Sequence, residues 1–416
     1  MTNTRIRISS LLLAISGLLT PHAAAFGAGK APKTHELTFS GKATPEQYYV
    51  PVYTSFTVPE GIVKISVTQH LGSGEARPGN LDLGIFDERG AGFEGPGFRG
   101  WSGGARRSFE IGETEATPGY LAGRINPGRW TVIQMPTTAG RTTDWTLKIT
   151  LTEGPRAKKL PAPSYAAPQL NDKPGWYRIA PHVHTVHSDG RLTPAEVIAL
   201  GKASGLDGIV STDHNTTSAL LHWGEVQDPE FLVINGVEVT YGQGHWNIFG
   251  LDPHAWIDFR IHHNDTLRYR KAVAKARKAG RLLVANHPYN LDFLYDVTPM
   301  DGIEVWNSAW SPANERAVEL WHTLLVGGNR KFAVASTDFH RGGNIASPHT
   351  VVRAEALSAE AVIDAIAAGR SYVARDASVE IGMQVRNSAT PVQHADIGDT
   401  PVSYTHLRAH ETSAHL

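Results

Sequence analysis

The chain has 416 residues and a formal net charge of −1, with 39 Lys and Arg against 40 Asp and Glu. This balance argues against general electrostatic attraction to nucleic acid or to an anionic membrane. The chain has no cysteine but 20 histidines. Disulfides are therefore excluded, and any metal ion must be held by imidazole and carboxylate groups. The length predicts two or three domains.

Residues 1–25 have the pattern of a secretory signal peptide. Arg5 and Arg7 precede an apolar run over 8–19, and alanines at 23–25 offer a cleavage site. The run is too short to span a bilayer, and a buried core helix is the alternative interpretation. We expect an exported protein, periplasmic or extracellular in a bacterium, with no transmembrane segment after cleavage. The pattern leaves the oligomeric state undetermined.

Residues 33–155 predict a β-sandwich. Short apolar or alternating runs such as IVKISVTQ (62–69) are separated by Gly, Pro and Asp turns. Two loops, 95–107 and 116–130, carry Arg, Trp and Tyr. They are interpreted either as a surface that binds ligand or covers an active site, or as ordinary turns. A glycan-binding sandwich is another possibility, but no strong aromatic ladder supports it. Residues 156–174, rich in Pro, Ala and charge, predict a linker.

Residues 175–375 alternate short strands with helices. Helices are predicted near 193–205, with Thr193 as the N-cap, near 265–280 with Asp265 as the cap, and near 358–369. Alternation of this kind predicts an α/β fold with a parallel sheet, and the number of units favours a barrel.

The carboxyl-terminal part does not continue this pattern. Residues 376–402 are expected to begin a truncated β-rich region. Residues 403–416, SYTHLRAHETSAHL, resemble translated sequencing-adapter read-through and are expected to be non-native. A genuine histidine-rich, metal-scavenging tail is the alternative.

Histidines and carboxylates gather at the strand ends of the predicted barrel. The candidates are His182, His184, Asp189, His214, Glu238, His245, His287, Asp338 and His340. The carboxyl ends of barrel strands converge on one face, so we expect these side chains to meet. They exceed the needs of one ion, which predicts two or three divalent ions as cofactors. Imidazole with carboxylate favours Zn, Mn or Fe over Ca or Mg.

A catalytic role for such a site would use a metal-bound water as the nucleophile, because a water bridging two cations loses a proton near neutral pH. Arg341 is a candidate clamp for developing negative charge, and His187 a candidate proton donor. Tyr289, Trp306 and Asn307 are candidates for lining the substrate pocket. Asp213 is expected to orient a neighbouring ligand. Glu304, in the strand before Trp306, is predicted to face either way.

The motifs HVHTVHSDG (182–190), STDH (211–214), GVE (236–238), NHP (286–288) and STDFH (336–340) resemble those of the PHP (polymerase and histidinol phosphatase) superfamily. The resemblance covers residues 175–375 and implies a distorted (β/α)7 barrel behind an all-β sandwich. It also implies metal-dependent phosphoesterase activity. The segments DLGIFD (82–87) and GHWNIFG (244–250) resemble the CehA/McbA-like branch, named for carbamate-ester hydrolases. No polymerase-sized region accompanies the barrel.

The resemblance implies roles for the candidate ligands. His182 and His184, with Glu238 and Asp338, would hold one ion, and Glu238 would bridge to a second ion held by His245 and His287. Asp189, His214 and His340 would complete a third site. One departure is Pro181, where relatives often carry aspartate, so one orienting partner is expected to be missing.

The expected function is therefore an exported metal-dependent hydrolase that acts through a metal-bridged hydroxide on a small-molecule ester. Phosphomonoesters or phosphodiesters are the first expectation. Carbamate or carboxylic esters are the alternative, and a non-catalytic metal-binding protein is the alternative of another class.

Overall fold

The computed structural model describes residues 32–72, 78–262, 265–290, 293, 296–379, 381–387, 390–394 and 406–411. The predicted signal peptide lies outside the described residues. No helix in the described part of the chain is long and apolar enough to cross a membrane.

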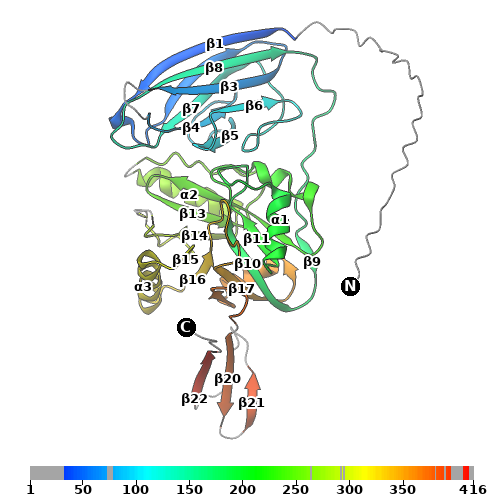
Figure 1. Ribbon diagram of the computed structural model, residues 1–416, viewed down its shortest axis with the longest axis vertical. Helices are drawn as coiled ribbons and strands as arrows, with labels where there is room; N and C mark the ends of the chain where they lie inside the picture. The colour runs from blue at the N-terminus through cyan, green and yellow to red at the C-terminus, as the bar shows by residue number, and fades with distance from the viewer. Residues whose placement is uncertain are drawn as a thin grey trace, which may run out of the picture. The chain divides into compact units, whose positions relative to one another are not determined.

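The sandwich consists of two four-stranded antiparallel sheets (Figure 1). One has the order β1 (Thr34–Ala43), β8 (Thr143–Glu153), β3 (Ile62–Gly72), β6 (Ser108–Gly112). The other has the order β2 (Val52–Val58), β7 (Gly128–Pro136), β4 (Leu81–Phe86), β5 (Phe98–Gly103). Burial alternates along β1 and β8, as expected when one face of a sheet packs on a core and the other meets solvent. A short 3-10 helix, η1 (Pro45–Gln47), connects β1 to β2.

A nine-stranded sheet forms the second body. Its strands are β10 (Gly175–Val183), β11 (Gly208–Ser211), β12 (Leu232–Tyr241), β13 (Gly244–Phe249), β14 (Leu282–Asn286), β15 (Gly302–Asn307), β16 (Phe332–Ser336), β17 (His349–Ala354) and β19 (Ser371–Ala374). The order is β16-β15-β14-β13-β12-β11-β10-β17-β19. The sheet nearly closes on itself, because the backbone of Phe339, just after β16, exchanges hydrogen bonds with His182 (3.3 Å) and His184 (2.9 Å). The ends of β10 and β16, where the candidate ligands lie, thus meet.

Four helices accompany this sheet: α1 (Pro194–Ala203), α2 (Thr266–Ala279), α3 (Pro312–Val326) and α4 (Ala359–Ala367). The predicted caps are confirmed at Thr193, which forms a capping box with Glu196, and at Asp265. Each satisfies a backbone N–H of the first turn that would otherwise lack a partner. Helix α3 begins at a proline that the sequence pattern did not single out.

The described residues do not alternate strictly between strand and helix. The segment between β11 and β12 forms two short 3-10 helices, η2 (Ser218–Leu221) and η3 (Trp223–Val226). Strands β12 and β13 form an antiparallel hairpin around Gly242 and Gln243 instead of flanking a helix. Two residues can join antiparallel strands but cannot build the crossover that parallel strands need. The molecule is therefore multidomain and mostly β, with a barrel-like sheet and few helices.

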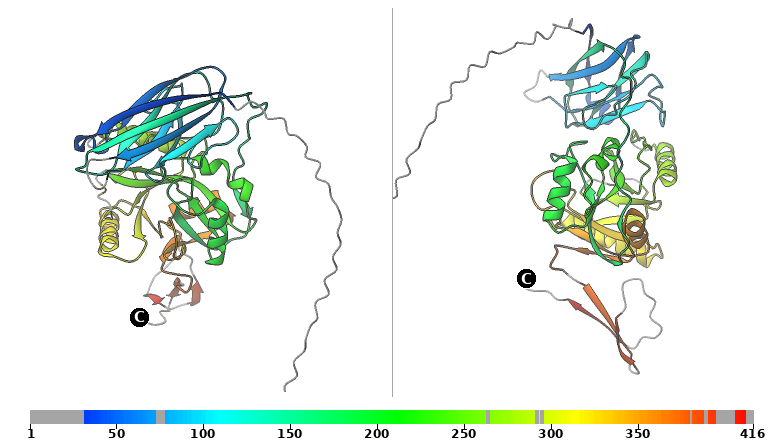
Figure 2. Two further views of the ribbon diagram at one scale, coloured as in Figure 1. Left: turned by 45° about the horizontal axis from the view of Figure 1, so that its top comes forward. Right: turned by 90° about the vertical axis from the view of Figure 1, so that its right-hand side faces the viewer.

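Two small sheets complete the described chain. In the predicted linker, β9 (Gln169–Asn171) pairs with β18 (Leu357–Ser358). Further on, β20 (Ile381–Asn387) pairs with β21 (Thr390–His394) and with β22 (His406–Glu411). Figure 2 shows this three-stranded sheet and the layered strands of the sandwich from two other directions. The segment between β21 and β22 lies outside the described residues.

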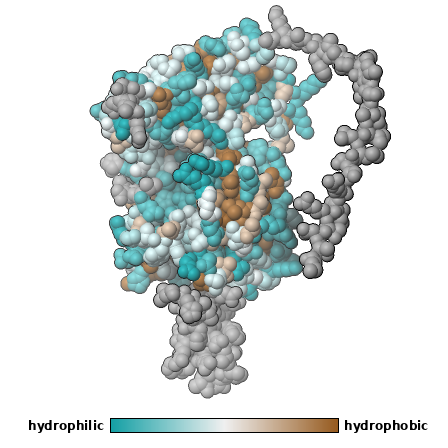
Figure 3. Space-filling view, viewed as in Figure 1, coloured by the Kyte–Doolittle hydropathy of each residue, from teal (hydrophilic) through white to brown (hydrophobic). Residues whose placement is uncertain are grey.

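Sandwich and barrel share one hydrophobic cluster. Phe98 of the sandwich stacks on Trp256 of the barrel with ring centroids 4.3 Å apart, and Trp101 lies 4.5 Å from Phe259. Arg260 donates hydrogen bonds to the sandwich carbonyl oxygens of Ala91 (2.8 Å) and Gly92 (2.9 Å). The loop 95–107 is thus packed against the barrel. On the face in Figure 3, hydrophilic and neutral residues predominate and the apolar ones form small separate patches.

Candidate metal centre

The nine predicted ligands come from separate strand ends and are brought together at one end of the barrel. His182 lies near the end of β10, and His184 and Asp189 follow in its loop. Glu238 and His245 face each other from the β12–β13 hairpin. The remaining four, His214, His287, Asp338 and His340, follow β11, β14 and β16. Alternation explains why His182 and His184, at the end of β10 and just after it, lie together, because residues two apart in extended chain point to the same face.

Glu238 is the centre of the cluster and is fully buried. Five imidazole nitrogens lie within 3.5 Å of its carboxylate oxygens. They are those of His182 (3.3 Å), His184 (3.5 Å), His214 (2.8 Å), His245 (3.2 Å) and His287 (3.5 Å). An unpaired charged carboxylate is energetically costly to bury. Glu238 therefore requires positive charge nearby, either on protonated histidines or on a cation that it and the histidines bind together.

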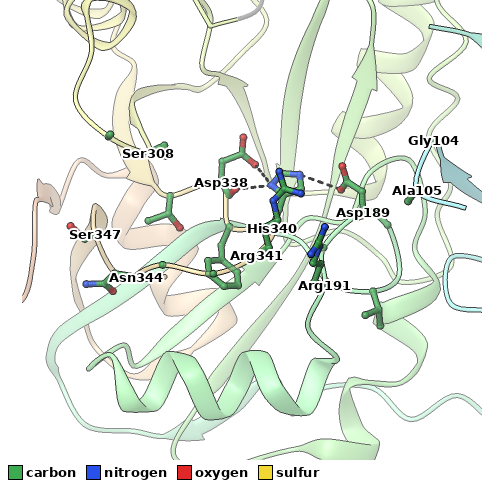
Figure 4. A pocket seen from close by; sticks show the side chains of 18 of the residues that line it. Gly104, Ala105, Asp189, Arg191, Ser308, Asp338, His340, Arg341, Asn344 and Ser347 are labelled. Atoms are coloured by element: carbon green, nitrogen blue, oxygen red, sulfur yellow. Dashed lines mark hydrogen bonds and ion pairs between the residues drawn. The ribbon is translucent and has the colours of Figure 1, made fainter. Parts of the chain in front are cut away.

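Two further carboxylates flank Glu238. Asp338 Oδ1 lies 2.9 Å from His184 Nε2 and 3.2 Å from His182 Nε2. On the outer side, Asp189 Oδ1 lies 3.2 Å from His340 Nε2 and 3.5 Å from His214 Nε2. Figure 4 shows His340 between the two aspartates. The three carboxylates therefore lie between imidazoles that they share.

These donors form four overlapping groups in which the ligand atoms lie within 4.8 Å of one another. The groups are His182, His184 and Glu238; His182, His287 and Asp338; His214, Glu238 and His245; and His184, Asp189, His214 and His340. The overlap through Glu238, His182 and His214 is the arrangement that a site for adjacent ions requires. The grouping differs from the ligand sets that the family resemblance implied, because His184 also belongs to the group with Asp189, His214 and His340.

The residues present fit divalent ions. Two buried atoms that lie 3.3 Å apart, His182 Nε2 and Glu238 Oε2, have no hydrogen-bond partner among the described residues. Buried polar atoms are nearly always paired, so a pair of this kind marks the place of a missing partner. Both atoms are of a type that binds Zn, Mn or Fe.

Burial and the charges of neighbouring side chains together set the pKa values of the clustered residues. Burial raises the pKa of the Glu238 carboxyl, but His182, His214 and His245 outweigh it and hold that pKa well below its usual value. Burial, together with the charges of His214 and His340, lowers the pKa of His184 to about 4. His184 is therefore neutral at physiological pH, which is the form in which an imidazole binds a metal.

Glu304 of β15 contacts both His182 and His287. Its Oε1 lies 3.1 Å from His182 Nδ1, and its Oε2 accepts a hydrogen bond from the backbone N–H of His287 (3.0 Å). It thereby supplies the orienting carboxylate that the residue at Pro181 does not. The alternation of β15 made Glu304 a possible inward-facing residue but did not decide its direction.

Two polar residues of the site escaped the sequence analysis. Asn286 Nδ2 donates to Glu238 Oε1 (2.8 Å), and Thr240 Oγ1 lies 2.5 Å from His214 Nδ1. Asn286 directly precedes His287, and Thr240 lies two residues after Glu238 on the same strand face. The period of two in β12 was a usable signal for Thr240.

The structure gives Asp213 a different task from the expected one. Its carboxylate accepts hydrogen bonds from Thr185 N (2.8 Å), Thr185 Oγ1 (2.8 Å) and Ser188 Oγ (2.7 Å). It therefore fixes the loop between His184 and Asp189 rather than contacting a ligand imidazole. His187 is buried, with its Nδ1 2.8 Å from Ser218 Oγ, and lines neither of the two cavities next to the cluster.

Three predicted pocket residues line neither of these two cavities. Tyr289 lies beneath Arg316 (4.1 Å from ring centroid to guanidinium carbon). Trp306 packs edge-on against Trp310, with centroids 5.0 Å apart. Asn307 donates to Glu304 Oε2 (3.1 Å). A position at a strand end places a residue near the mouth of a barrel but does not decide which way its side chain turns.

The larger cavity, about 1240 Å³, lies beside Asp189, Asp338 and His340 (Figure 4). It is lined by the predicted clamp Arg341, by Arg191, and by Arg106 from the sandwich. Arg106 Nη2 donates to the carbonyl oxygen of Val186 (2.5 Å), and its buried Nε has no hydrogen-bond partner in the part of the chain that the structure describes. The cavity is therefore polar and basic, and the sandwich forms part of its wall.

A smaller cavity, about 270 Å³, opens on the other side of Asp189. From the barrel it is lined by His214, His245, Tyr241 and Phe259, and from the sandwich by Tyr49, Asp82, Trp101 and Met135. The loop 95–107 thus belongs to the surroundings of the metal cluster. The metal-ligand candidates lie between a basic cavity and an aromatic one.

Several solved structures share features with this chain at low identity. A two-domain protein with a predicted PHP-like metal-dependent phosphoesterase from Bacteroides vulgatus is 19% identical, with a TM-score of 0.38, over 56% of this chain and 78% of that one. A putative metal-dependent phosphoesterase from Bifidobacterium adolescentis is 16% identical, with a TM-score of 0.30, over 50% of this chain and 96% of that one. An amidohydrolase from Chromobacterium violaceum is 19% identical, with a TM-score of 0.30, over 40% of this chain and 89% of that one.

No protein-family model and no curated protein matches the chain. Because the TM-scores are low, the chemistry proposed below depends on the side chains of the site and not on these likenesses.

Proposed function

We propose that the protein is an exported metal-dependent hydrolase of the PHP and CehA/McbA type that cleaves phosphoesters. The observation that carries the proposal is the environment of Glu238, a buried carboxylate with five imidazole nitrogens within 3.5 Å. A structural core does not need such an arrangement, whereas adjacent divalent ions do.

Divalent ions bound here would activate water and polarise the ester oxygen. The chain's own residues would do the positioning. Glu304 orients His182 and the backbone of His287, and Asp213 fixes the loop that carries Asp189. Fixing ligands from a second layer keeps the reacting groups in place without rearrangement during the reaction.

The larger cavity favours an anionic ester. Arg106, Arg191 and Arg341 line it, and guanidinium groups bind phosphate oxygens through paired hydrogen bonds. These residues would hold the phosphoryl group against the cluster and stabilise the charge that develops there. Arg341 thus keeps its predicted role within the proposal.

A second candidate is a carbamate or carboxylic ester hydrolase. The small cavity favours it, because Tyr49, Trp101, Tyr241 and Phe259 would also hold the apolar alcohol part of an uncharged ester. The basic cavity would then have no anion to bind.

The test is turnover by the metal-loaded chain of matched substrates: an aryl phosphate, an aryl phosphodiester and an aryl carbamate. We expect phosphate-ester turnover that falls by at least about a hundredfold in Glu238→Gln. Arg341→Ala should lower turnover of phosphate esters only. Turnover of the carbamate alone would replace the leading candidate by the second.

If the protein binds metal without catalysis, the chain should contain stoichiometric metal and turn over none of these esters.

Export is a separate part of the proposal. Expression of the full chain in a Gram-negative host, followed by fractionation, should place a chain shortened near residue 25 in the periplasm. A full-length chain retained in the cytoplasm would contradict export.

A further inference from the structure

The small cavity contains a carboxylate that the proposed hydrolysis does not use. Asp82, from β4 of the sandwich, lines it together with His214 and His245. The cavity is therefore continuous with the metal cluster on one side and ends at a sandwich residue on the other.

Among the residues that the structure describes, one oxygen of Asp82 accepts hydrogen bonds. Oδ1 accepts hydrogen bonds from Asn80 Nδ2 (2.6 Å) and Thr137 Oγ1 (3.2 Å). No ion pair or hydrogen bond to Oδ2 is found among the described residues. The nearby Arg107 donates to the carbonyl oxygen of Leu81 instead (3.4 Å). Asp82 lines the cavity and thus has one acceptor oxygen for which the described residues supply no hydrogen bond.

Aromatic rings form the rest of the cavity wall. Tyr49 and Tyr241 lie with centroids 5.2 Å apart at an angle of 55°, and Trp101 and Phe259 lie 4.5 Å apart at 56°. The Tyr241 hydroxyl donates to the backbone carbonyl of Tyr49, which fixes the first pair. Each pair joins one ring of the sandwich to one ring of the barrel.

A carboxylate surrounded by aromatic rings is suited to an organic cation. The faces of Trp and Tyr rings carry negative charge that attracts an ammonium group, most strongly where water is excluded. A neutral apolar group would fill the same space but would leave Asp82 Oδ2 without a partner, which disfavours its binding. A second anion would be repelled by the same carboxylate.

We propose that this cavity binds the ammonium group of an amino-alcohol ester, with Asp82 as its counter-charge and the aromatic rings as its walls. The ester bond would then lie at the metal cluster and the anionic part in the basic cavity. The inference rests on the proposed function for the ester bond, but not for binding of the cation. The sandwich becomes a specificity-determining part of the enzyme.

The test compares phosphocholine with 3,3-dimethylbutyl phosphate, in which carbon replaces the charged nitrogen at the same size. Phosphate release by the metal-loaded full chain should show a kcat/KM about tenfold higher for phosphocholine. Asp82→Asn should abolish this preference by lowering kcat/KM for phosphocholine only. The exposed sandwich residue Asp144, paired with Lys42, supplies the control Asp144→Asn, which should keep the preference.

Binding of choline itself separates this inference from the proposed function. Calorimetry should detect choline binding to the wild-type chain and to Asp144→Asn but not to Asp82→Asn. Choline binding without turnover of any ester would overturn the proposed function and leave the cation site standing. Phosphoester turnover with equal kcat/KM for both substrates, and no choline binding, would overturn the cation site alone.

Gly242→Ala gives a second variant that does not change any charge. A Cβ at Gly242 would lie 2.4 Å from ring atoms of Tyr49, so that ring must move. We expect weaker choline binding with turnover of 3,3-dimethylbutyl phosphate retained. Unchanged choline binding in both Gly242→Ala and Asp82→Asn would place any cation elsewhere.

Discussion

Glu304 contacts two parts of the cluster at once, through His182 Nδ1 (3.1 Å) and the backbone N–H of His287 (3.0 Å). Glu304→Gln keeps the size of the side chain and one acceptor oxygen but removes the charge. We expect metal affinity to fall roughly 10- to 100-fold while the fold is retained. Metal titration followed by calorimetry measures this change, with circular dichroism as the check on folding. Unaltered metal affinity would show that Glu304 does not orient a ligand.

Asp82 predicts a pH-dependent stability. Burial raises the pKa of its carboxyl to about 7, above its usual value of 3.8, so ionisation is disfavoured in the folded chain. The resulting penalty is absent at pH 4 and grows as the pH rises toward 7. Asp82→Asn should therefore melt at a higher temperature than the wild type, by a margin that widens from pH 4 to 7 and then stays constant.

Thermal melts of the chelator-treated proteins at several pH values measure that margin, and Asp144→Asn serves as the exposed control. A margin that is independent of pH, or that narrows as the pH rises, would contradict a buried and destabilising Asp82. The same penalty is what a bound ammonium group would relieve, so function and stability oppose each other at this residue.

The sequence could indicate which candidate ligands lie close together, because each of them has a local signal. His182 and His184 share a strand face, and Asp338 and His340 follow a buried strand directly, so strand ends alone place them together. Asp82 and Tyr49 have no such signal. Their position depends on how the sandwich packs on the barrel through residues such as Trp101 and Phe259, which is long-range packing that local patterns do not encode.

At the scale of elements, the attachment of the sandwich depends on a buried ion pair. Arg260 Nη2 lies 2.6 Å from Asp258 Oδ2, both side chains are almost inaccessible, and Arg260 also donates to Ala91 O and Gly92 O. Its guanidinium lies over Phe86 of the sandwich at 4.4 Å. Arg260 of the barrel thus pairs with a buried carboxylate and also contacts the sandwich directly.

Arg260→Ala leaves Asp258 buried without its partner, and we expect the free energy of unfolding to fall by about 3–5 kcal/mol. Urea denaturation measures this loss. Arg281→Ala, which removes an exposed pair with Asp364, should cost less than about 1 kcal/mol. Similar small losses in both variants would mean that Arg260 does not carry the attachment.

The element boundaries show where local patterns end. The capped helices α1, α2 and α4 follow from Thr193, Asp265 and Ser358, because a cap is a local hydrogen bond. The β12–β13 hairpin replaces an expected helical connection, since the short turn at Gly242 allows only an antiparallel return. An alternating strand pattern does not distinguish a parallel from an antiparallel neighbour.

For the whole molecule, the shared hydrophobic cluster predicts that sandwich and barrel unfold together. The cluster contains Phe86, Phe98 and Trp101 of the sandwich with Trp246 and Phe259 of the barrel. Metal bound in the barrel should therefore stabilise the sandwich too, by about 2.7 kcal/mol at a hundred times Kd. Scanning calorimetry with Zn²⁺ or Mn²⁺ should show one transition shifted upward. A separate sandwich transition that ignores metal would contradict the coupling.

The most direct test of the account is the metal content of the chain from Phe26 to residue 402, measured by elemental analysis against protein concentration. The variants Glu238→Ala and His182→Ala are measured beside it, with Asp144→Asn as the control. We predict two or three Zn, Mn or Fe ions per chain in the wild type and the control, with the largest loss in Glu238→Ala because that carboxylate joins the ligand groups. Less than about half an ion per chain, unaffected by added metal or by either variant, would show that the cluster does not bind metal.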